Sequence, residues 1–294
     1  MKNIGSSFTV AALVLIVVLV SCGDSEDNIP TMYWTDFGTN VIQQANINGT
    51  NVQELVAGLG APIDIAIDES TGKMYWTNRD TDMIQRANLD GSSVEDLYTG
   101  IDMPYGIALD ASAGMVYWVY AASPPEKVQR AAMDGSGPIE DLFDIGNAPY
   151  GLELDIAAGK MYWTDSSEKT IQRANMDGTG IIEDLFTETD GLTIPLGIAL
   201  DVTANKMYWV DEGPEKIRRA NMDGSGNIED LFDGTDGLIS PYGIMLDIIA
   251  SKIYWTDFGT KMIHRANMDG TGEVEDLITF SSSSNFPSGI VLKQ

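Results

Sequence analysis

The sequence predicts an all-β fold, a six-bladed β-propeller made of four-stranded antiparallel blades. One tetrapeptide recurs six times and contains every tryptophan of the chain. The copies are Tyr33-Trp34-Thr35-Asp36, Tyr75-Trp76-Thr77-Asn78, Tyr117-Trp118-Val119-Tyr120, Tyr162-Trp163-Thr164-Asp165, Tyr208-Trp209-Val210-Asp211 and Tyr254-Trp255-Thr256-Asp257. Successive copies lie 42, 42, 45, 46 and 46 residues apart. A period in the forties that is filled with short strand signals is typical of propeller blades.

Each repeat contains four strand signals, which the second unit shows most clearly. Apolar runs rich in strand formers alternate there with short polar loops. The expected strands cover residues 73–77, 83–87, 94–97 and 104–110. Asp90-Gly91 supplies a tight hairpin turn between the second and third of them, and an Asp-Gly or Asn-Gly pair recurs at this place in every unit. The glutamate-bearing strand that follows this turn is expected at the outer edge of its blade, where charge prevents edge-to-edge association.

The phase of the repeat predicts how the ring closes. The chain enters the repeats on a Tyr-Trp strand and ends with residues 287–292, which have the pattern of an innermost strand. The C-terminal strand should therefore complete the first blade. We take residues 31–294 as one propeller domain.

The N-terminus has the features of an export signal. Lys2 precedes an apolar run from Val10 to Val20 that is too short to span a bilayer. The run ends in Leu19-Val20-Ser21-Cys22, which resembles the bacterial lipobox. We expect residues 1–21 to be a lipoprotein signal peptide, Cys22 to be lipidated and residues 22–30 to form an acidic tether. The alternatives are a plain signal peptide cut near Ser21 or a buried free thiol. The expected location is the bacterial cell envelope, and exposure at the cell surface stays open.

The charge of the chain restricts its partners. Seventeen basic and 44 acidic residues give a formal net charge of −27, with acidic residues in every repeat and no basic stripe. Such a surface repels phosphate backbones, so we expect no nucleic-acid partner. A cationic protein partner or bound cations fit this sign, and a role in solubility alone is the alternative. The single cysteine excludes an internal disulfide.

The repeats resemble the class B repeats of the low-density lipoprotein receptor family. The resemblance is carried by the Tyr-Trp-Thr-Asp units, the Ile-x-Arg-Ala-Asn-x-Asp-Gly hairpins and the Gly-Ile-Ala-Leu-Asp strands. It implies a six-bladed propeller that recognises proteins through its loop face. The motif aspartate is replaced by Asn78 and Tyr120, and the strand arginine by Gln44. We expect the motif aspartates and the strand arginines to lie near each other and to hold the blades together.

Few residues are suited to catalysis. His264, the only histidine, is expected on a solvent-facing strand position, and zinc would need more histidine or cysteine ligands. We therefore expect no catalytic residue, metal or cofactor, although calcium in the channel stays open. Asp64 replaces the glycine of the innermost strands and Glu153 replaces an alanine. Each is either a polar contact in the central channel or a drift of the repeat, with a local arginine as partner of Glu153.

One residue of each blade, between proline and glycine, should begin the innermost strand beside the channel mouth. These residues are Ile63, Tyr105, Tyr150, Leu196, Tyr242 and Ser288. Three tyrosines and two aliphatic residues around one opening suit an anchor site for a peptide side chain. We therefore expect the ligand to bind at the first five of these positions and at Asp64. The alternative is that these side chains only pack within the propeller.

The sequence thus predicts a monomeric, lipid-anchored propeller that binds a protein or peptide and is not an enzyme. Contact with the membrane is expected only through the lipid. Two alternatives remain: a calcium-dependent, lactonase-like hydrolase and an envelope scaffold without a tight ligand.

Overall fold

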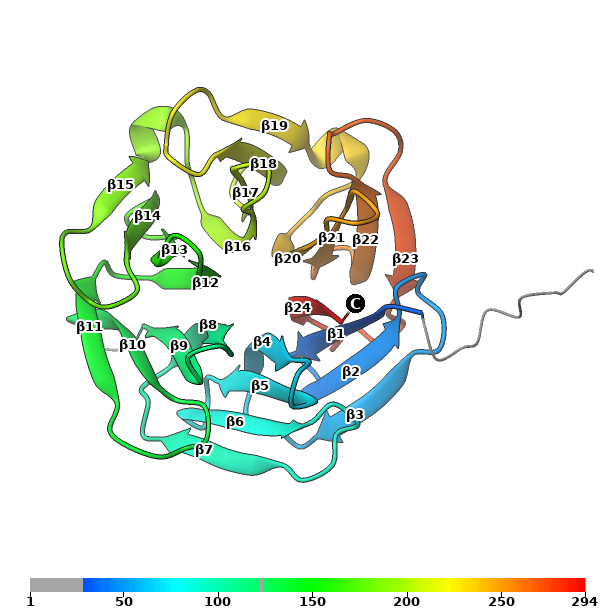
Figure 1. Ribbon diagram of the computed structural model, residues 1–294. Coiled ribbons are helices and arrows are strands. Elements are labelled where there is room, and N and C mark those ends of the chain that lie inside the picture. Colours follow the sequence, from blue (N-terminus) through cyan, green and yellow to red (C-terminus); the bar gives the residue numbers. More distant parts are fainter. Residues whose placement is uncertain (1–28, 122–123, 294) are drawn as a thin grey trace, which may run out of the picture.

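Six four-stranded antiparallel sheets form a closed ring in the computed structural model, which confirms the predicted propeller (Figure 1). The structure describes residues 29–121 and 124–293. The expected signal peptide, Cys22 and most of the tether lie outside these residues. The last strand pairs with the first one, with Met32 opposite Leu292 and Trp34 opposite Ile290. The predicted closure of the ring by the C-terminal strand is therefore also confirmed.

Each blade has the same order of strands from the channel outward. The innermost strands are β24 (Pro287–Lys293), β4 (Pro62–Asp68), β8 (Pro104–Asp110), β12 (Pro149–Asp155), β16 (Pro195–Asp201) and β20 (Pro241–Asp247). The Tyr-Trp strands are β1 (Thr31–Asp36), β5 (Lys73–Asn78), β9 (Met115–Tyr120), β13 (Lys160–Asp165), β17 (Lys206–Asp211) and β21 (Lys252–Asp257). The third strands are β2 (Val41–Asn46), β6 (Met83–Asn88), β10 (Glu126–Ala132), β14 (Thr170–Asn175), β18 (Lys216–Asn221) and β22 (Met262–Asn267). The outer strands are β3 (Gln53–Ala57), β7 (Glu95–Thr99), β11 (Glu140–Ile145), β15 (Glu183–Phe186), β19 (Glu229–Phe232) and β23 (Glu275–Thr279).

The ring has two chemically different faces. The innermost strands begin on one face, where the connections from the preceding blade and the turns after the Tyr-Trp strands also lie; we call it the mouth face. The Asp-Gly and Asn-Gly turns between third and outer strands lie on the opposite one, the hairpin face. Short 3₁₀ turns, η2 (Glu188–Asp190) and η3 (Gly234–Asp236), occupy the two longest connections. No helix of the described residues is long and apolar enough to cross a bilayer.

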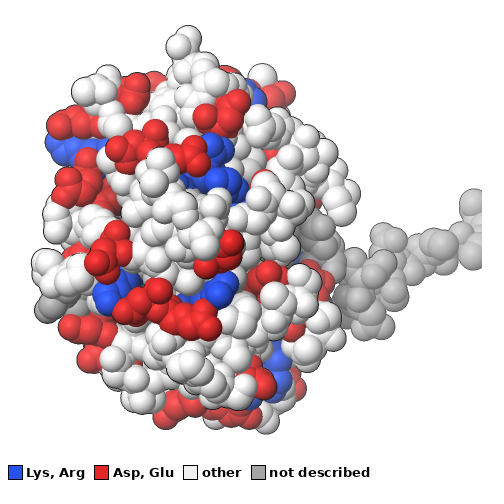
Figure 2. All heavy atoms as spheres, turned by 60° about the vertical axis from the view of Figure 1, so that its left-hand side comes forward, with Lys and Arg blue, Asp and Glu red and all other residues white. Residues whose placement is uncertain are grey.

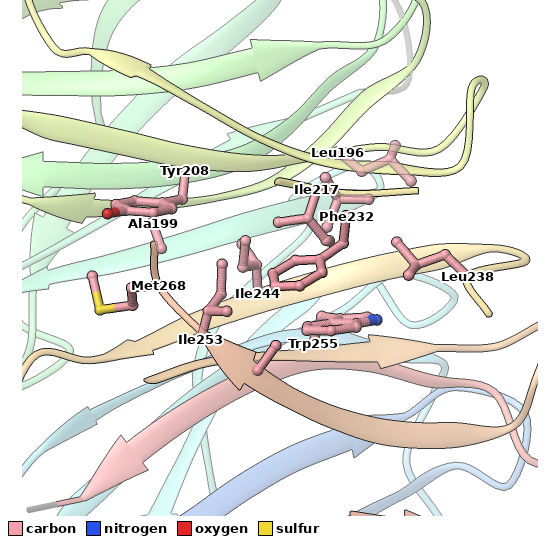
Figure 3. Packing of buried hydrophobic residues seen from close by; sticks show 12 residues of the cluster. Leu196, Ala199, Tyr208, Ile217, Phe232, Leu238, Ile244, Ile253, Trp255 and Met268 are labelled. Carbon is pink, nitrogen blue, oxygen red and sulfur yellow. The ribbon is translucent and has the colours of Figure 1, made fainter. Parts of the chain in front are cut away.

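The core consists of apolar wedges between neighbouring blades. Every tryptophan is fully buried, and each one packs against the blade before its own. Figure 3 shows one wedge, in which Phe232 of β19 stacks on Trp255 of β21 with ring centroids 5.7 Å apart. Tyr98 stacks on Trp118 in the same way. Burial of such rings on both sides of a blade explains why its strands need no polar face.

The threonine of the motif joins neighbouring blades close to the channel. In four blades its hydroxyl donates to a main-chain carbonyl of the next innermost strand; the donors and acceptors are Thr35 and Ile63, Thr77 and Tyr105, Thr164 and Leu196, and Thr256 and Ser288, at 2.6–2.8 Å. The same hydroxyl accepts a hydrogen bond from a main-chain N–H of its own innermost strand; these donors are Gly289, Asp64, Gly151 and Gly243. Val119 and Val210 take this place in the other two blades and lack the hydroxyl.

The arginines also join blades, but not in the way the sequence suggested. Arg86 binds Glu95 on the outer strand of its own blade and donates to the carbonyl of Met133 in the next blade. Arg86 lies opposite Tyr75, three residues before Asn78, which takes the place of the motif aspartate in this blade. The expected contact between motif aspartates and strand arginines is therefore wrong. Figure 2 shows that lysines and arginines lie among acidic side chains on the outer surface.

The motif aspartates hold loops of the mouth face instead. Asp36 accepts hydrogen bonds from the main-chain N–H groups of Gly38, Thr39 and Phe286. Asp211 does contact an arginine, but this is Arg218, the neighbour of the strand arginine, at 2.7 Å. Asp36, Asp165 and Asp257 each fix the turn that follows their own strand. Asp211 instead accepts hydrogen bonds from the main-chain N–H groups of Thr193 and Ile194, in the connection before β16. Buried carboxylates require such donors.

We predict that Thr164→Val lowers the free energy of unfolding by about 1–3 kcal/mol, because the main-chain groups of Gly151 and Leu196 lose their partner in a buried place. This corresponds to roughly 2–4 °C in Tm per kcal/mol. Valine already occupies this position in two blades, so the packing should tolerate it. Val210→Thr is the matched control and should not destabilise the protein. Equal stability of Thr164→Val and the parent, measured by denaturant unfolding, would refute the role of this bridge.

Candidate functional site

The residues expected to ring the channel begin the innermost strands on the mouth face. In each of these strands the two residues after the proline face a single residue of the Tyr-Trp strand, as in the register from Pro104 to Ile107 opposite Tyr120 and Trp118. Such a bulge re-aims a side chain. Three of the six side chains are buried and the three tyrosines are half-buried; the buried ones are Ile63, Leu196 and Ser288.

The three tyrosines contact one another. The ring centroids of Tyr105 and Tyr150 are 5.1 Å apart, and those of Tyr150 and Tyr242 are 5.0 Å apart in an edge-on arrangement. Leu196 belongs to the buried cluster against which Tyr150 and Tyr242 pack. Burial, together with the nearby Tyr105, raises the pKa of the Tyr242 hydroxyl above its ordinary value. The three tyrosines thus pack against other residues of the propeller, and part of each side chain remains exposed.

Three phenylalanines that the sequence reasoning missed extend this cluster. Phe37 and Phe258 follow the motif in the first and last units, and Phe286 precedes β24. Tyr242 lies 5.6 Å from Phe258 and 6.0 Å from Phe37, and Phe37 stacks on Phe286 at 5.3 Å. We call the six rings the aromatic patch: Phe37, Tyr105, Tyr150, Tyr242, Phe258 and Phe286. All six are half-buried.

Two cations border the aromatic patch. The guanidinium of Arg79 lies 5.9 Å from the ring centroid of Phe37, and the ammonium of Lys261 lies 4.1 Å from that of Phe286. Cation–π attraction holds both side chains over the rings. The residue after the motif is Phe37, Arg79, Ala121, Ser166, Glu212 and Phe258 in successive units. Comparing this position across the repeats is the sequence signal that could have revealed the patch.

A cavity of about 320 Å³ lies behind the mouth, along the channel. Main chain and side chains of all six innermost strands line it, and most lining side chains are aliphatic. Tyr150 and Tyr242 contribute to its wall on the mouth side. The charged residues of its lining are Asp64 of β4 and Glu153 of β12. The two residues that broke the repeat pattern in the sequence therefore meet at one cavity.

Asp64 occupies a place that elsewhere admits only glycine. A Cβ atom on Gly106 would lie 2.3 Å from the carbonyl oxygen of Tyr150, because neighbouring innermost strands approach so closely there. At Asp64 the carboxylate accepts hydrogen bonds from the N–H groups of Ile65 and of Ile107, on the next innermost strand, at 2.9 and 3.0 Å. Burial raises the pKa of Asp64 to about 6 even though these two hydrogen bonds favour the charged form.

Glu153 has no basic partner among the described residues, so the local arginine suggested by the sequence is not found. Burial, and then the negative charge of Asp64, raises the pKa of Glu153 to about 8. At neutral pH the two carboxyl groups therefore share about one negative charge. Tyr150 lines the same cavity, and its hydroxyl is buried without a hydrogen-bond partner in the described structure.

The expectation that His264 faces the solvent is wrong. Its side chain is buried, with 4 % of its surface exposed, and stacks on Trp255 with ring centroids 5.4 Å apart. Nδ1 lies 2.9 Å from the carboxylate of Asp276, and Nε2 lies 3.0 Å from the hydroxyl of Thr260. Both ring nitrogens are thus occupied by contacts within the last blade. Within residues 29–121 and 124–293, no group of three or more His, Cys, Asp or Glu could hold a metal ion.

Three segments of the chain match the family model of the low-density lipoprotein receptor repeat class B, namely residues 31–69, 72–111 and 159–202. These three segments are class B repeats. Each matched segment begins on a Tyr-Trp strand and ends with the innermost strand of the next blade. One repeat therefore contributes to two blades, which explains why the C-terminal strand has to close the ring. No curated protein matches the sequence in a direct comparison.

The class B repeats are arranged as in solved propellers. A chain of a nidogen–laminin complex is 24% identical, with a TM-score of 0.77, and the match covers 90% of this chain and 98% of that one. A streptogramin B lyase is 18% identical, with a TM-score of 0.63, and the match covers 90% and 84% of the two chains. A luciferin-regenerating enzyme is 13% identical, with a TM-score of 0.61 over 75% and 76%. At these identities the likeness establishes the propeller fold.

We predict that Glu153→Gln stabilises the protein at pH 9 and leaves its stability nearly unchanged at pH 5. The folded state holds the Glu153 proton up to about pH 8. The unfolded state releases it near the ordinary value of 4.5. Stability of the parent is therefore lost as the pH rises between these values. The expected gain at pH 9 is on the order of 1–2 kcal/mol, or roughly 2–8 °C in Tm.

Glu183→Gln is the matched control, because Glu183 pairs with Arg173 on the surface and its pKa is lowered. This variant should gain nothing at pH 9. Thermal unfolding at both pH values distinguishes the two variants, and a Glu153→Gln protein that is no more stable at pH 9 would contradict the proposed burial of this carboxyl group.

Proposed function

We propose that this protein is a lipid-anchored component of the bacterial cell envelope and that its propeller binds a protein or peptide through the aromatic patch. The observation that carries the proposal is the asymmetry of the mouth face. The three phenylalanines of the patch belong to the first and last blades, whereas Ala121, Ser166 and Glu212 take the position of Phe37 in three other blades. The three tyrosines continue the patch from the starts of β8, β12 and β20. A continuous half-exposed cluster of aromatic rings is what interface hot spots use.

The nidogen–laminin complex supports a protein ligand, since a propeller of the same fold occurs there in a complex between proteins. The loops next to the aromatic patch carry exposed acidic side chains, among them Asp80 and Asp102. A ligand with apolar side chains for the patch and basic residues beside them would match both the rings and the net charge.

The anchor rests on the N-terminal sequence. Cys22 follows Leu19-Val20-Ser21 directly after the apolar run, and the residues between Cys22 and β1 suffice as a tether. Lipidation there would hold the propeller at the membrane without a membrane-spanning segment. Incorporation of a fatty acid by the parent and its loss in Cys22→Ala test this part of the proposal separately.

A hydrolase is the competing function, as some structural neighbours are enzymes by their names. A calcium-dependent hydrolase of the kind considered above needs several carboxylates that converge on one ion, whereas the channel of the described residues offers Asp64 and Glu153. We therefore favour a non-enzymatic binding module.

We predict that peptides selected from a random display library on the immobilised protein bind through the aromatic patch. The double variant Phe37→Ala/Phe258→Ala should bind these peptides at least ~10-fold more weakly, because aromatic hot spots contribute about 1–2 kcal/mol or more each. Ile249→Ala is the matched control: Ile249 is an apolar residue of the opposite face with 83% of its surface exposed. Equal affinity of the double variant and the control, in proteins with unchanged melting curves, would exclude the patch as the binding site.

A further inference from the structure

The central cavity has the size and the wall of a small-molecule site. Its volume of about 320 Å³ lies at the lower end of the range for ligand pockets. The six innermost strands line it. Figure 1 shows these strands arranged around the centre of the ring. None of the residues that the proposed peptide site requires, apart from Tyr150 and Tyr242, contributes to this wall.

Access to the cavity is from the hairpin face. On the mouth side, Tyr150 and Tyr242 contact each other across the channel, and Ile63 beside them is buried. On the other side each innermost strand contributes one aliphatic residue that lines the cavity and is partly exposed; these are Ile67, Leu109, Leu154, Leu200, Leu246 and Leu292. Ile248, 41% exposed, extends this rim. An apolar molecule can therefore approach the cavity over an apolar rim.

The cavity has one charged region, which is acidic. Asp64 uses its two carboxylate oxygens for the N–H groups of Ile65 and Ile107, so that its charge stays in the wall without a counter-ion. Glu153 forms no ion pair among the described residues. The buried hydroxyl of Tyr150 lacks a partner. In a region of low dielectric constant, uncompensated carboxyl groups attract a positive charge strongly.

The kind of cation follows from the rest of the wall. A metal ion prefers several oxygen ligands around one point, and no group of three or more acidic, histidine or cysteine side chains occurs in the described part of the chain. Most of the lining side chains are instead aliphatic. The wall therefore matches a molecule with a single positive charge at one end and a hydrocarbon body.

We propose that the channel is a binding site for a small organic cation, an alkyl or arylalkyl amine in its ammonium form. Glu153 and Asp64 bind the ammonium group, the hydroxyl of Tyr150 accepts a hydrogen bond from it, and the aliphatic side chains of the innermost strands cover the hydrocarbon part. This function is separate from peptide binding at the mouth face, so either can fail while the other holds.

Binding has to be coupled to the release of a proton. In the free protein Glu153 stays largely protonated below pH 8, because its half-buried carboxyl group is poorly solvated and lies near the charge of Asp64. An ammonium group next to it favours the carboxylate and lowers this pKa. Affinity should therefore increase as the pH rises from about 6 to about 8.5, where alkylamines remain protonated. Of the other titratable groups around the cavity, Asp64 ionises at the lower end of this interval, since burial raises its pKa to about 6. Burial also raises the pKa of Tyr242 above its ordinary value, so Tyr242 stays neutral.

The test is a calorimetric titration of the full chain in detergent with propylammonium, cyclohexylammonium and benzylammonium, with benzyl alcohol as the neutral counterpart and empty micelles as the blank. At least one amine should saturate a single site and bind at least ~10-fold more tightly than its neutral counterpart. Glu153→Gln should weaken binding at least ~10-fold and remove the dependence of the affinity on pH above about pH 7, where Asp64 is already ionised. Asp90→Asn removes a charge from an exposed hairpin of the same face and should leave the affinity unchanged.

Each other outcome overturns the proposal. Absence of saturable binding by all three amines up to about 10 mM would mean that the cavity is not an amine site. Equal affinity for benzyl alcohol would show an apolar cavity that does not select charge. Displacement of the amine by micromolar calcium would identify a metal site instead. Unchanged binding by Glu153→Gln, whose folding the melting curve reports, would place the amine elsewhere.

Discussion

The close approach of the innermost strands around the channel is the constraint on which this structure depends. Where glycine follows the second residue of such a strand, the next strand lies so near that a Cβ atom would collide with its main chain, as at Gly243 and the carbonyl of Ser288. The motif threonines hold this arrangement by hydrogen bonds to both strands, as Thr256 does between Gly243 and Ser288. Polar main-chain groups of the channel wall thereby find partners although no regular sheet joins the blades there.

The same constraint explains why Asp64 and Glu153 matter. A channel wall made of glycine, alanine and aliphatic residues is neutral and nearly symmetric. Asp64 departs from this pattern without disrupting the ring. Its carboxylate accepts a hydrogen bond from the N–H of Ile107, on the neighbouring innermost strand that lies close to this position. Glu153 adds a second acidic group two blades away, in a wall without a basic residue. These two acidic groups make the wall of the cavity asymmetric and give it a negative charge.

The two ends of the channel differ in chemistry because different parts of the repeat reach them. The mouth face presents the start of the innermost strands and the turn after the Tyr-Trp strand, and there the rings of Phe37 and Tyr242 meet. The hairpin face presents the ends of the innermost strands and their partly exposed leucines. A macromolecular ligand at the first and a small molecule at the second would not compete for the same surface. A rigid ring suits such a division, since neither end needs the other to move.

The sequence alone determined the architecture, and the reason is physical. A motif that recurs every 42 to 46 residues repeats one set of local interactions, so that blade number, strand order and the closure by residues 287–293 all follow from its phase. It also marked Asp64, Glu153 and the tyrosine ring, because a departure from a repeat is visible without coordinates.

Only the tertiary structure shows which residues contact one another when they are distant in the sequence. His264 occupies a position that is polar in other units, yet it is buried on Trp255, and Thr260 and Asp276 of the same blade contact its ring nitrogens. The strand arginines bind outer-strand glutamates and carbonyls of the next blade, whereas Asp36 binds Phe286, 250 residues away in the chain. Phe37, Phe258 and Phe286 form one patch only because the ring brings the two ends of the chain together. Such contacts join residues that are far apart in the sequence, and a local repeat pattern does not predict them.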